Sequence, residues 1–360
     1  MVPTARLAVG IHLDSTHMSV VMVDLLARTL AERILEAPTD NPEGDIARIL
    51  AAVEDLCAET RQMLRTDETE SHDGTAPPHH PASEPRDPTS DDPEKAGYRP
   101  ELLGIGIAAS GGVDSDRGVM MDPPWLPGWR EVPVTSLIHE ATGLPVMLDK
   151  DTHAALAAEI WVGRHAPRGT VLYLYVGDGI GSAVAEDGVV RRGDRGRAGE
   201  IGHLGTGLGT ERCRCGRLGC LSLYTDADAL LQRAEALGIL DADAGGQRRD
   251  RLKILTESAA AGDQLTLALL ERPGAALAEA MRTLVDIHDA EQVIIGGPYW
   301  DQICDVALPL LHEHADHEVA HGFSAVQLVP STLGRSVGAI GAAVLFLTHD
   351  LSPGNPHGLG

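Results

Sequence analysis

A histidine and three cysteines lie close together in the second half of the chain, at His203, Cys213, Cys215 and Cys220. The chain has 360 residues and 5 cysteines, so most of its cysteines fall in this one segment. Three thiolates and one imidazole form the ligand set of a closed tetrahedral zinc site. A disulfide or simple buried thiols are the alternatives, but a Cys-x-Cys pair has poor geometry for a disulfide. The spacing therefore predicts a structural zinc loop over residues 203–220, with Zn²⁺ bound by these four side chains.

The length and composition of the chain indicate a globular protein outside the membrane. At 360 residues the chain is long enough for one large or two medium domains. It contains no run of about 18 apolar residues, so we expect no membrane partner. The first residues lead directly into a strand-like segment and form no secretory signal, which makes the cytoplasm the expected compartment.

The charge balance argues against a nucleic-acid surface. The net charge is −24, from 53 acidic and 29 basic residues. Nucleic-acid backbones are bound by clustered Lys and Arg, and bases stack on aromatic rings, which make up only 3% of the chain. We therefore expect DNA to be bound only through a helix-turn-helix module that these residues do not contain.

Strand-like and helix-like segments alternate along the chain, which predicts an α/β fold. The expected strands are residues 6–13, 18–25, 28–37, 102–108, 145–148, 171–176, 292–295 and 326–329. The expected helices are residues 44–64, 151–164 and 336–348. Residues 66–98 lack Leu, Ile, Val, Met and Phe and are rich in Pro and acidic side chains. Such a segment cannot bury enough apolar surface to offset its ordering entropy, so we expect a disordered insertion there.

Several motifs together resemble the ROK family (repressors, open reading frames and kinases) of the actin-like ATPase superfamily. The most specific is the zinc segment with the preceding Ala-Gly-Glu-Ile-Gly-His of residues 198–203. Further matches are residues 103–108, 126–129, 179–181, 293–297 and 336–343. The resemblance implies two ribonuclease-H-like lobes with a cleft between them, and a homodimer. The lobes would comprise residues 1–130 and 131–335, followed by a helix at 336–348 that returns to the first lobe and a flexible tail at 349–360.

The resemblance also implies a sugar in the cleft. In the kinases of the family an aspartate acts as general base toward the sugar hydroxyl, and Asp151 matches it. An aspartate at this position would equally cap a helix, so both roles stay open. Glu200 and His203 match residues that hydrogen-bond sugar hydroxyls, with His203 also binding zinc.

Four positions near this site depart from the kinase pattern. Lys150 and His153 replace asparagines on either side of Asp151, and Ser222 replaces a glutamate. Trp125 replaces a further asparagine, and it either stacks on the sugar or blocks the pocket. We retain Lys150 and Trp125 as candidate substrate-binding residues.

The first phosphate loop departs further. His12 stands where the kinases have the aspartate that coordinates magnesium through water, and Asp14 and Ser15 replace two glycines. Those glycines allow backbone N–H groups to approach a phosphate. A carboxylate at Asp14 would instead repel a triphosphate, so we expect a degenerate ATP site.

Two other glycine pairs match nucleotide-side loops of the family. Gly179 and Gly181 follow an expected strand, with Asp178 in place of a threonine. Gly296 and Gly297 match the loop on the adenosine side. Glycine turns after strands are also common for structural reasons, so these are weak candidates for nucleotide binding.

Three functions agree with this pattern. The favoured one is a transcriptional-regulator-type, sugar-sensing domain with a degenerate ATP site, although the expected helix-turn-helix does not precede the first strand. An ATP-dependent hexose or N-acetylhexosamine kinase, similar to glucokinase, would use Asp151 as its base and ATP with Mg²⁺ as cofactor. A stand-alone, non-catalytic sugar-binding protein is the third. All three have a small sugar as ligand and structural Zn²⁺ as cofactor.

Overall fold

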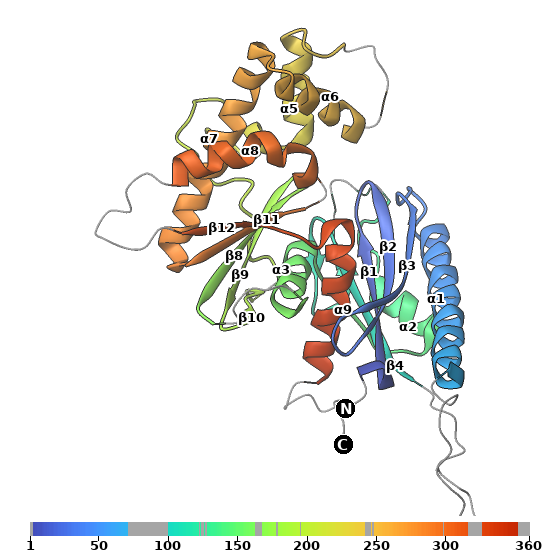
Figure 1. Ribbon diagram of the computed structural model, residues 1–360. Coiled ribbons are helices and arrows are strands. Elements are labelled where there is room, and N and C mark those ends of the chain that lie inside the picture. The colour runs from blue at the N-terminus through green and yellow to red at the C-terminus, as the bar shows by residue number, and fades with distance from the viewer. Residues whose placement is uncertain are drawn as a thin grey trace, which may run out of the picture.

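The computed structural model describes most of the chain. The described residues are 3–70, 100–162 except Asp122, Pro124, Trp125 and Pro127, 168–241 except Asp178 and Arg195, 246–315 except Gln247 and Pro298, and 326–351. They form two five-stranded mixed sheets with helices between and around them (Figure 1). This confirms the predicted α/β class. None of the helices within these ranges is both long and apolar enough to cross a lipid bilayer.

The two sheets share one topology. The first has the order β3-β2-β1-β4-β7, and the second β10-β9-β8-β11-β12. The strands of the first sheet are β1 (Arg6–Leu13), β2 (His17–Asp24), β3 (Thr29–Glu36), β4 (Glu101–Ala109) and β7 (Val146–Lys150). The second sheet contains β8 (Thr170–Val176), β9 (Ile180–Glu186), β10 (Val189–Val190), β11 (Gln292–Gly296) and β12 (Gln327–Pro330). In each sheet the central strand, β1 or β8, is antiparallel to the next strand in sequence and parallel to a later one.

The first sheet extends beyond residue 130, where we placed the end of the first lobe. Strand β7 pairs in parallel with β4, so residues 146–150 complete the first sheet. The second sheet begins only at Thr170. The change of sheet therefore lies between β7 and β8, a stretch of sequence in which hydropathy alone gives no boundary.

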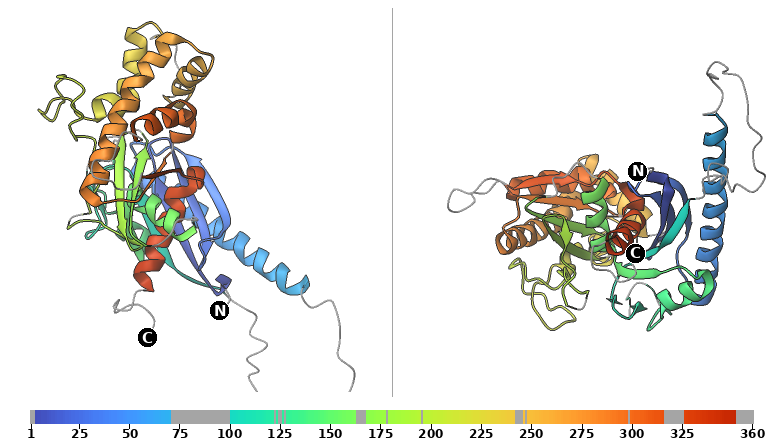
Figure 2. Two further views of the ribbon diagram at one scale, coloured as in Figure 1. Left: turned by 60° about the vertical axis from the view of Figure 1, so that its left-hand side comes forward. Right: turned by 90° about the horizontal axis from the view of Figure 1, so that it is seen from below.

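Two helices lie between the sheets, α3 (Asp151–Val162) and α9 (Val337–Asp350) (Figure 2). Helix α9 packs on β1 and β4 through glycines that leave no room for a side chain. A Cβ on Gly10 or Gly106 would come within 1.9 Å of a carbonyl oxygen of α9, and one on Gly341 within 1.7 Å of the carbonyl oxygen of Ala154 in α3. The small residues of α9 therefore allow the helix backbones and the sheet to touch directly.

The remaining helices lie on the outer sides of the two sheets. Helices α1 (Pro42–Glu70) and α2 (Val134–Thr142) belong to the first sheet. The second sheet is covered by α7 (Gln264–His288) and α8 (Trp300–Ala315). Helices α4 (Ser222–Thr225), α5 (Ala227–Ala236) and α6 (Arg248–Ala260) pack on these two helices, and α5 and α6 lie beyond them, away from the sheet (Figure 1). Side chains alternate along β8: Leu172 and Leu174 face these outer helices, and Tyr173 and Tyr175 face α3 and α9. This period of two is the pattern of a strand covered on both faces.

Every strand predicted from the sequence is present within a few residues, and so are the three predicted helices. Helix α1 continues to Glu70, into the segment predicted to be disordered. Residues 71–99 and 352–360 lie outside the described ranges. Strand β9, helix α2 and the short hairpin β5 (Val113–Asp114) and β6 (Val119–Met120) were not predicted.

Candidate functional site

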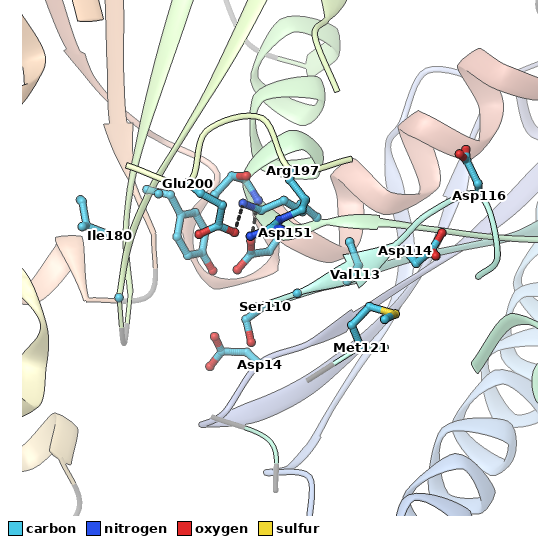
Figure 3. A pocket seen from close by; sticks show the side chains of 17 residues that line it. Asp14, Ser110, Val113, Asp114, Asp116, Met121, Asp151, Ile180, Arg197 and Glu200 are labelled. Carbon is cyan, nitrogen blue, oxygen red and sulfur yellow. Dashed lines mark hydrogen bonds and ion pairs between the residues drawn. The ribbon is translucent and has the colours of Figure 1, made fainter. Parts of the chain in front are cut away.

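A cavity of about 740 Å³ opens between the two sheets (Figure 3). Its walls come from the ends of parallel strands in the first sheet, which is where ligands bind in open α/β sheets. Asp14 follows β1, Ser110 follows β4, and Lys150 ends β7. The opposite wall is formed by the start of β9 and by the loop that carries Glu200.

Three predicted site residues meet inside this cavity. Lys150 Nζ lies 2.6 Å from Glu200 Oε1, and Asp151 is the first residue of α3 immediately after Lys150. Figure 3 shows the carboxylates of Asp151 and Glu200 on the same side of the cavity. Lys150 is buried and Glu200 is half exposed, so a ligand can reach the Glu200 carboxylate from the cavity.

Burial changes the acidity of Asp151. It raises the pKa of this carboxyl to about 7; the nearby Lys150 opposes the shift, and Asp14 adds to it. One oxygen accepts a hydrogen bond at 2.7 Å from the backbone N–H of Thr152, the next residue of α3. A capping side chain would bond an N–H two or three residues further on, so the capping role stays a prediction. The side chain thus bonds the first turn of α3 and is also a carboxyl that titrates near neutral pH.

The raised pKa of Asp151 predicts a pH-dependent stability. An acid whose pKa is higher in the folded state stabilises the fold below its unfolded pKa of about 3.8, and this contribution is lost as the pH rises through about 7. The raised pKa corresponds to a loss of stability on the order of 4 kcal/mol at pH 8.

Asp151→Asn should therefore melt at a higher temperature than wild type at pH 8, by a margin that shrinks toward pH 5. Asp116→Asn, at an exposed position on the same cavity, is the control and should follow the wild-type profile. A constant difference between Asp151→Asn and wild type across this range would contradict the prediction.

The loop after β1 is closed by its own side chains. Asp14 Oδ1 accepts hydrogen bonds from the backbone N–H of Thr16 at 2.9 Å and from its hydroxyl at 2.6 Å. His12 is buried against Gly338, and burial lowers its pKa to about 4, so the imidazole is neutral at pH 7. The loop therefore places a buried carboxylate at the cavity. The Thr16 N–H is bonded to this carboxylate and is not free to bind a ligand.

Two buried hydroxyl groups on the cavity wall have no protein partner among the described residues. They are Oγ of Ser110 and Oγ1 of Thr152. A buried hydroxyl without a hydrogen bond is costly, so such groups are usually satisfied by water or by a ligand. Their position makes them suitable partners for ligand hydroxyls, a feature that the sequence did not indicate.

The two glycine pairs differ in position. Gly179 and Gly181 line the cavity, and a Cβ on Gly181 would come within 2.6 Å of the Thr152 side chain. Gly296 and Gly297 do not line it. A Cβ on Gly296 would lie 2.4 Å from the Tyr173 hydroxyl and one on Gly297 2.5 Å from the Val176 carbonyl oxygen, so close packing around β8 explains both.

The predicted metal ligands come together at one point. One ligand atom from each of His203, Cys213, Cys215 and Cys220 lies within 4.8 Å of all the others. Cys215 Sγ and Cys220 Sγ are 3.6 Å apart, and so are Cys213 Sγ and His203 Nδ1. Ligands of a tetrahedral zinc ion with bonds of about 2.3 Å lie roughly 3.7 Å apart, whereas disulfide sulfurs bond at about 2.0 Å. The arrangement fits a metal and not a disulfide.

The charges of the thiols also fit a cation. Burial raises the pKa of Cys220 to about 12, and so do the hydrogen bonds that its S–H group donates to Cys215 and Cys213, whereas the pKa of Cys215 is lowered. Three thiolates so close together repel one another unless a cation lies between them.

Two of the predicted sugar contacts are not placed at the cavity. His203 lies three residues beyond Glu200, but it is not among the described residues that line the cavity, and its Nδ1 faces Cys213. Trp125 and Asp178 lie outside the described residues. Predicted residues that do line the cavity are Lys150, Asp151, Gly179, Gly181 and Glu200.

Comparisons with known proteins give consistent matches. Residues 93–349 match the family described as ROK family. A glucokinase of Halalkalibacterium halodurans is 28% identical over 255 residues, which cover 68% of this chain and 76% of the relative. The DNA-binding transcriptional repressor Mlc of Escherichia coli is 24% identical over 246 residues, 68% of this chain and 60% of the repressor. The crystal structure of a ROK family glucokinase from Streptomyces griseus, in complex with glucose and AMPPNP, superposes with a TM-score of 0.68 at 25% identity, covering 94% of this chain and 98% of that one.

Proposed function

The chain belongs to the ROK family, and on that premise we propose that it is a sugar-responsive protein of the regulator type. It binds a small sugar in the cavity between the sheets and does not transfer phosphate at an appreciable rate. Its relatives include both a glucokinase and a repressor, so the choice depends on the residues of the cavity.

The residues of the loop after β1 favour the regulator-type function over the kinase. A phosphate bound there would need free backbone N–H groups and no competing negative charge. Asp14 instead places a buried carboxylate on the cavity and takes the N–H of Thr16. His12 is neutral, so it supplies neither a magnesium-binding carboxylate nor a positive charge for phosphate. These residues oppose ATP binding and leave the sugar side of the cavity intact.

Other residues of the cavity support a sugar. The hydroxyls of Ser110 and Thr152 have no partner among the residues that the structure describes, and the carboxylates of Asp151 and Glu200 lie close to the cation of Lys150. Hydroxyls and carboxylates are suitable hydrogen-bond partners for a polyhydroxylated ligand. A sugar contact by the remaining ring nitrogen of His203, and one by Trp125, stay predictions.

Titration calorimetry with glucose, xylose and N-acetylglucosamine tests this proposal. We expect at least one of them to bind wild type, and Glu200→Gln to weaken that binding at least about tenfold because it removes a charge-assisted hydrogen bond. Asp194→Asn changes an exposed carboxylate on the same loop and should bind as wild type. Equal binding by Glu200→Gln, or binding of none of the sugars, would contradict the proposal.

A sugar kinase is the second candidate, and the pKa of Asp151 favours it. A general base works best when its pKa lies near the operating pH, and that of Asp151 is about 7. ATP with Mg²⁺ would supply the phosphoryl group in that case. A coupled assay with ATP–Mg²⁺ and the same sugars separates the candidates. Phosphorylation by wild type that is lost in Asp151→Asn would establish the kinase and overturn the regulator-type function.

We also propose that His203, Cys213, Cys215 and Cys220 hold a structural zinc ion. A closed site of four protein ligands supplies folding energy and leaves no position for catalysis. Because Glu200 and His203 are three residues apart, the ion would stabilise the same stretch of chain that brings Glu200 to the cavity.

A further inference from the structure

Two ion pairs join the two sheets beside the cavity. Arg192 and Glu200 lie on the loop after β10, in the second sheet, while Asp149 and Lys150 end β7 in the first. Arg192 Nε lies 2.5 Å from Asp149 Oδ2, and Lys150 Nζ lies 2.6 Å from Glu200 Oε1. Adjacent residues of one strand therefore hold both ends of a short loop from the other sheet.

Asp149 lies at the centre of this connection and does not line the cavity. Its side chain is fully buried, and Oδ1 accepts a hydrogen bond from the Lys150 N–H at 2.8 Å and lies 2.7 Å from His153 Nδ1 in α3. A buried carboxylate needs a positive partner to offset its desolvation, and the guanidinium of Arg192 provides that charge. Asp149 thus joins β7, the first turn of α3 and the loop from the second sheet.

The loop itself is closed and fixed to its own sheet. The N–H of Ala198 donates to the Arg192 carbonyl oxygen at 3.2 Å, and the N–H of Ser182 in β9 donates to the Gly199 carbonyl oxygen at 2.9 Å. A Cβ on Gly199 would come within 1.7 Å of the Ser182 carbonyl oxygen, so the loop lies directly on β9. Because the loop moves with the second sheet, its pair with Asp149 determines how Glu200 faces Lys150 and Asp151.

We propose that Asp149 is a positioning residue of the sugar site: through Arg192 it holds the Glu200 loop of one sheet against Lys150 and Asp151 of the other. This inference rests on the proposed function for the identity of the ligand, but not for the connection itself. Removing either charge should loosen the loop in the ligand-free protein and weaken sugar binding, although neither side chain touches the sugar.

Hydrogen–deuterium exchange of the full-length, ligand-free protein tests the connection directly. Asp149→Asn and Arg192→Gln should each speed exchange of the amides of residues 196–202 at least about tenfold, with little change in the sheets. The double variant should exchange no faster than either single one, because both remove the same pair. Arg192→Lys keeps the charge and should restore most of the protection. Arg191→Gln, whose native partner Glu186 is exposed on the surface, is the matched control and should exchange like wild type.

Calorimetry on the same variants completes the test. With whichever of glucose, xylose and N-acetylglucosamine binds wild type, Asp149→Asn and Arg192→Gln should raise the Kd at least about tenfold without additivity, and Arg191→Gln should not. Unchanged exchange in both charge-removing variants, or additive losses in the double variant, would overturn the inference. If the two charge-removing variants exchange faster but wild type binds none of the sugars, the proposed function is refuted and the connection between the sheets is retained. Arg192 is partly exposed, so Arg192→Gln provides the test if Asp149→Asn does not fold.

Discussion

Replacing Cys215 by serine should release the metal and unfold the segment around His203. We expect wild-type protein to contain about one zinc per chain and Cys215→Ser less than about 0.2, because three remaining ligands bind far more weakly than four. The segment has few apolar contacts of its own: Cys215 is exposed, and so are Leu208 and Leu218. We therefore expect its order to depend on the ion, and elemental analysis together with the melting temperature gives the measurement.

A cysteine outside the cluster provides the control for this prediction. Cys304→Ser alters a partly buried thiol in α8 and should keep the zinc content of wild type. Treatment of wild type with a chelator should reproduce the lower melting temperature of Cys215→Ser. Both should also weaken sugar binding, because the segment that would unfold adjoins Glu200. Full zinc occupancy and an unchanged melting temperature in Cys215→Ser would show that Cys215 is not a ligand of the ion and would contradict the four-ligand site.

The second large effect is expected from Gly341→Ala in α9. The added Cβ would lie 1.7 Å from the carbonyl oxygen of Ala154, a backbone atom that cannot rotate away. By helix propensity alone, alanine in place of glycine would stabilise the helix by about 1 kcal/mol. Separating two packed helix backbones costs more, on the order of 3 kcal/mol or above. The net effect should be a clear drop in melting temperature and reduced sugar binding, since α3 carries Asp151.

The matched control is a glycine with open space around it. Gly205 has no atom within 4 Å of its added Cβ, and its φ is not in the left-handed region. Gly205→Ala should therefore stay within about 0.5 kcal/mol of wild type. An equal melting temperature for Gly341→Ala and Gly205→Ala would contradict the direct backbone contact between α3 and α9.

Much of the fold could be predicted because the central strands are continuous apolar runs. β1, β4, β8 and β11 are buried on both faces, and α1 has an apolar face at helical spacing. Strand β9 was missed because its sequence, Ile-Gly-Ser-Ala-Val-Ala-Glu, is dominated by small residues with low strand propensity. It is a strand because β8 pairs with it along its whole length, a contact that no local pattern encodes.

The site could be predicted only where chemistry is local in sequence. Lys150, Asp151 and Glu200 stand in recognisable motifs, and the structure brings them to one cavity. Asp149 and Arg192 carry no such motif, and their pairing arises from the way two sheets pack. The lone hydroxyls of Ser110 and Thr152 were equally invisible, because whether a hydroxyl has a partner is decided by its surroundings in three dimensions.

The position of α9 has a consequence for synthesis. Residues 337–350 pack on β1 and β4, which a ribosome makes more than two hundred residues earlier. Until α9 has left the exit tunnel, that face of the first sheet, with Gly10 and Gly106, has no covering helix. A nascent chain would thus expose an apolar sheet surface until α9 has been made, a state that is prone to aggregation. A chain that stops before α9 would have first strands that never gain this cover.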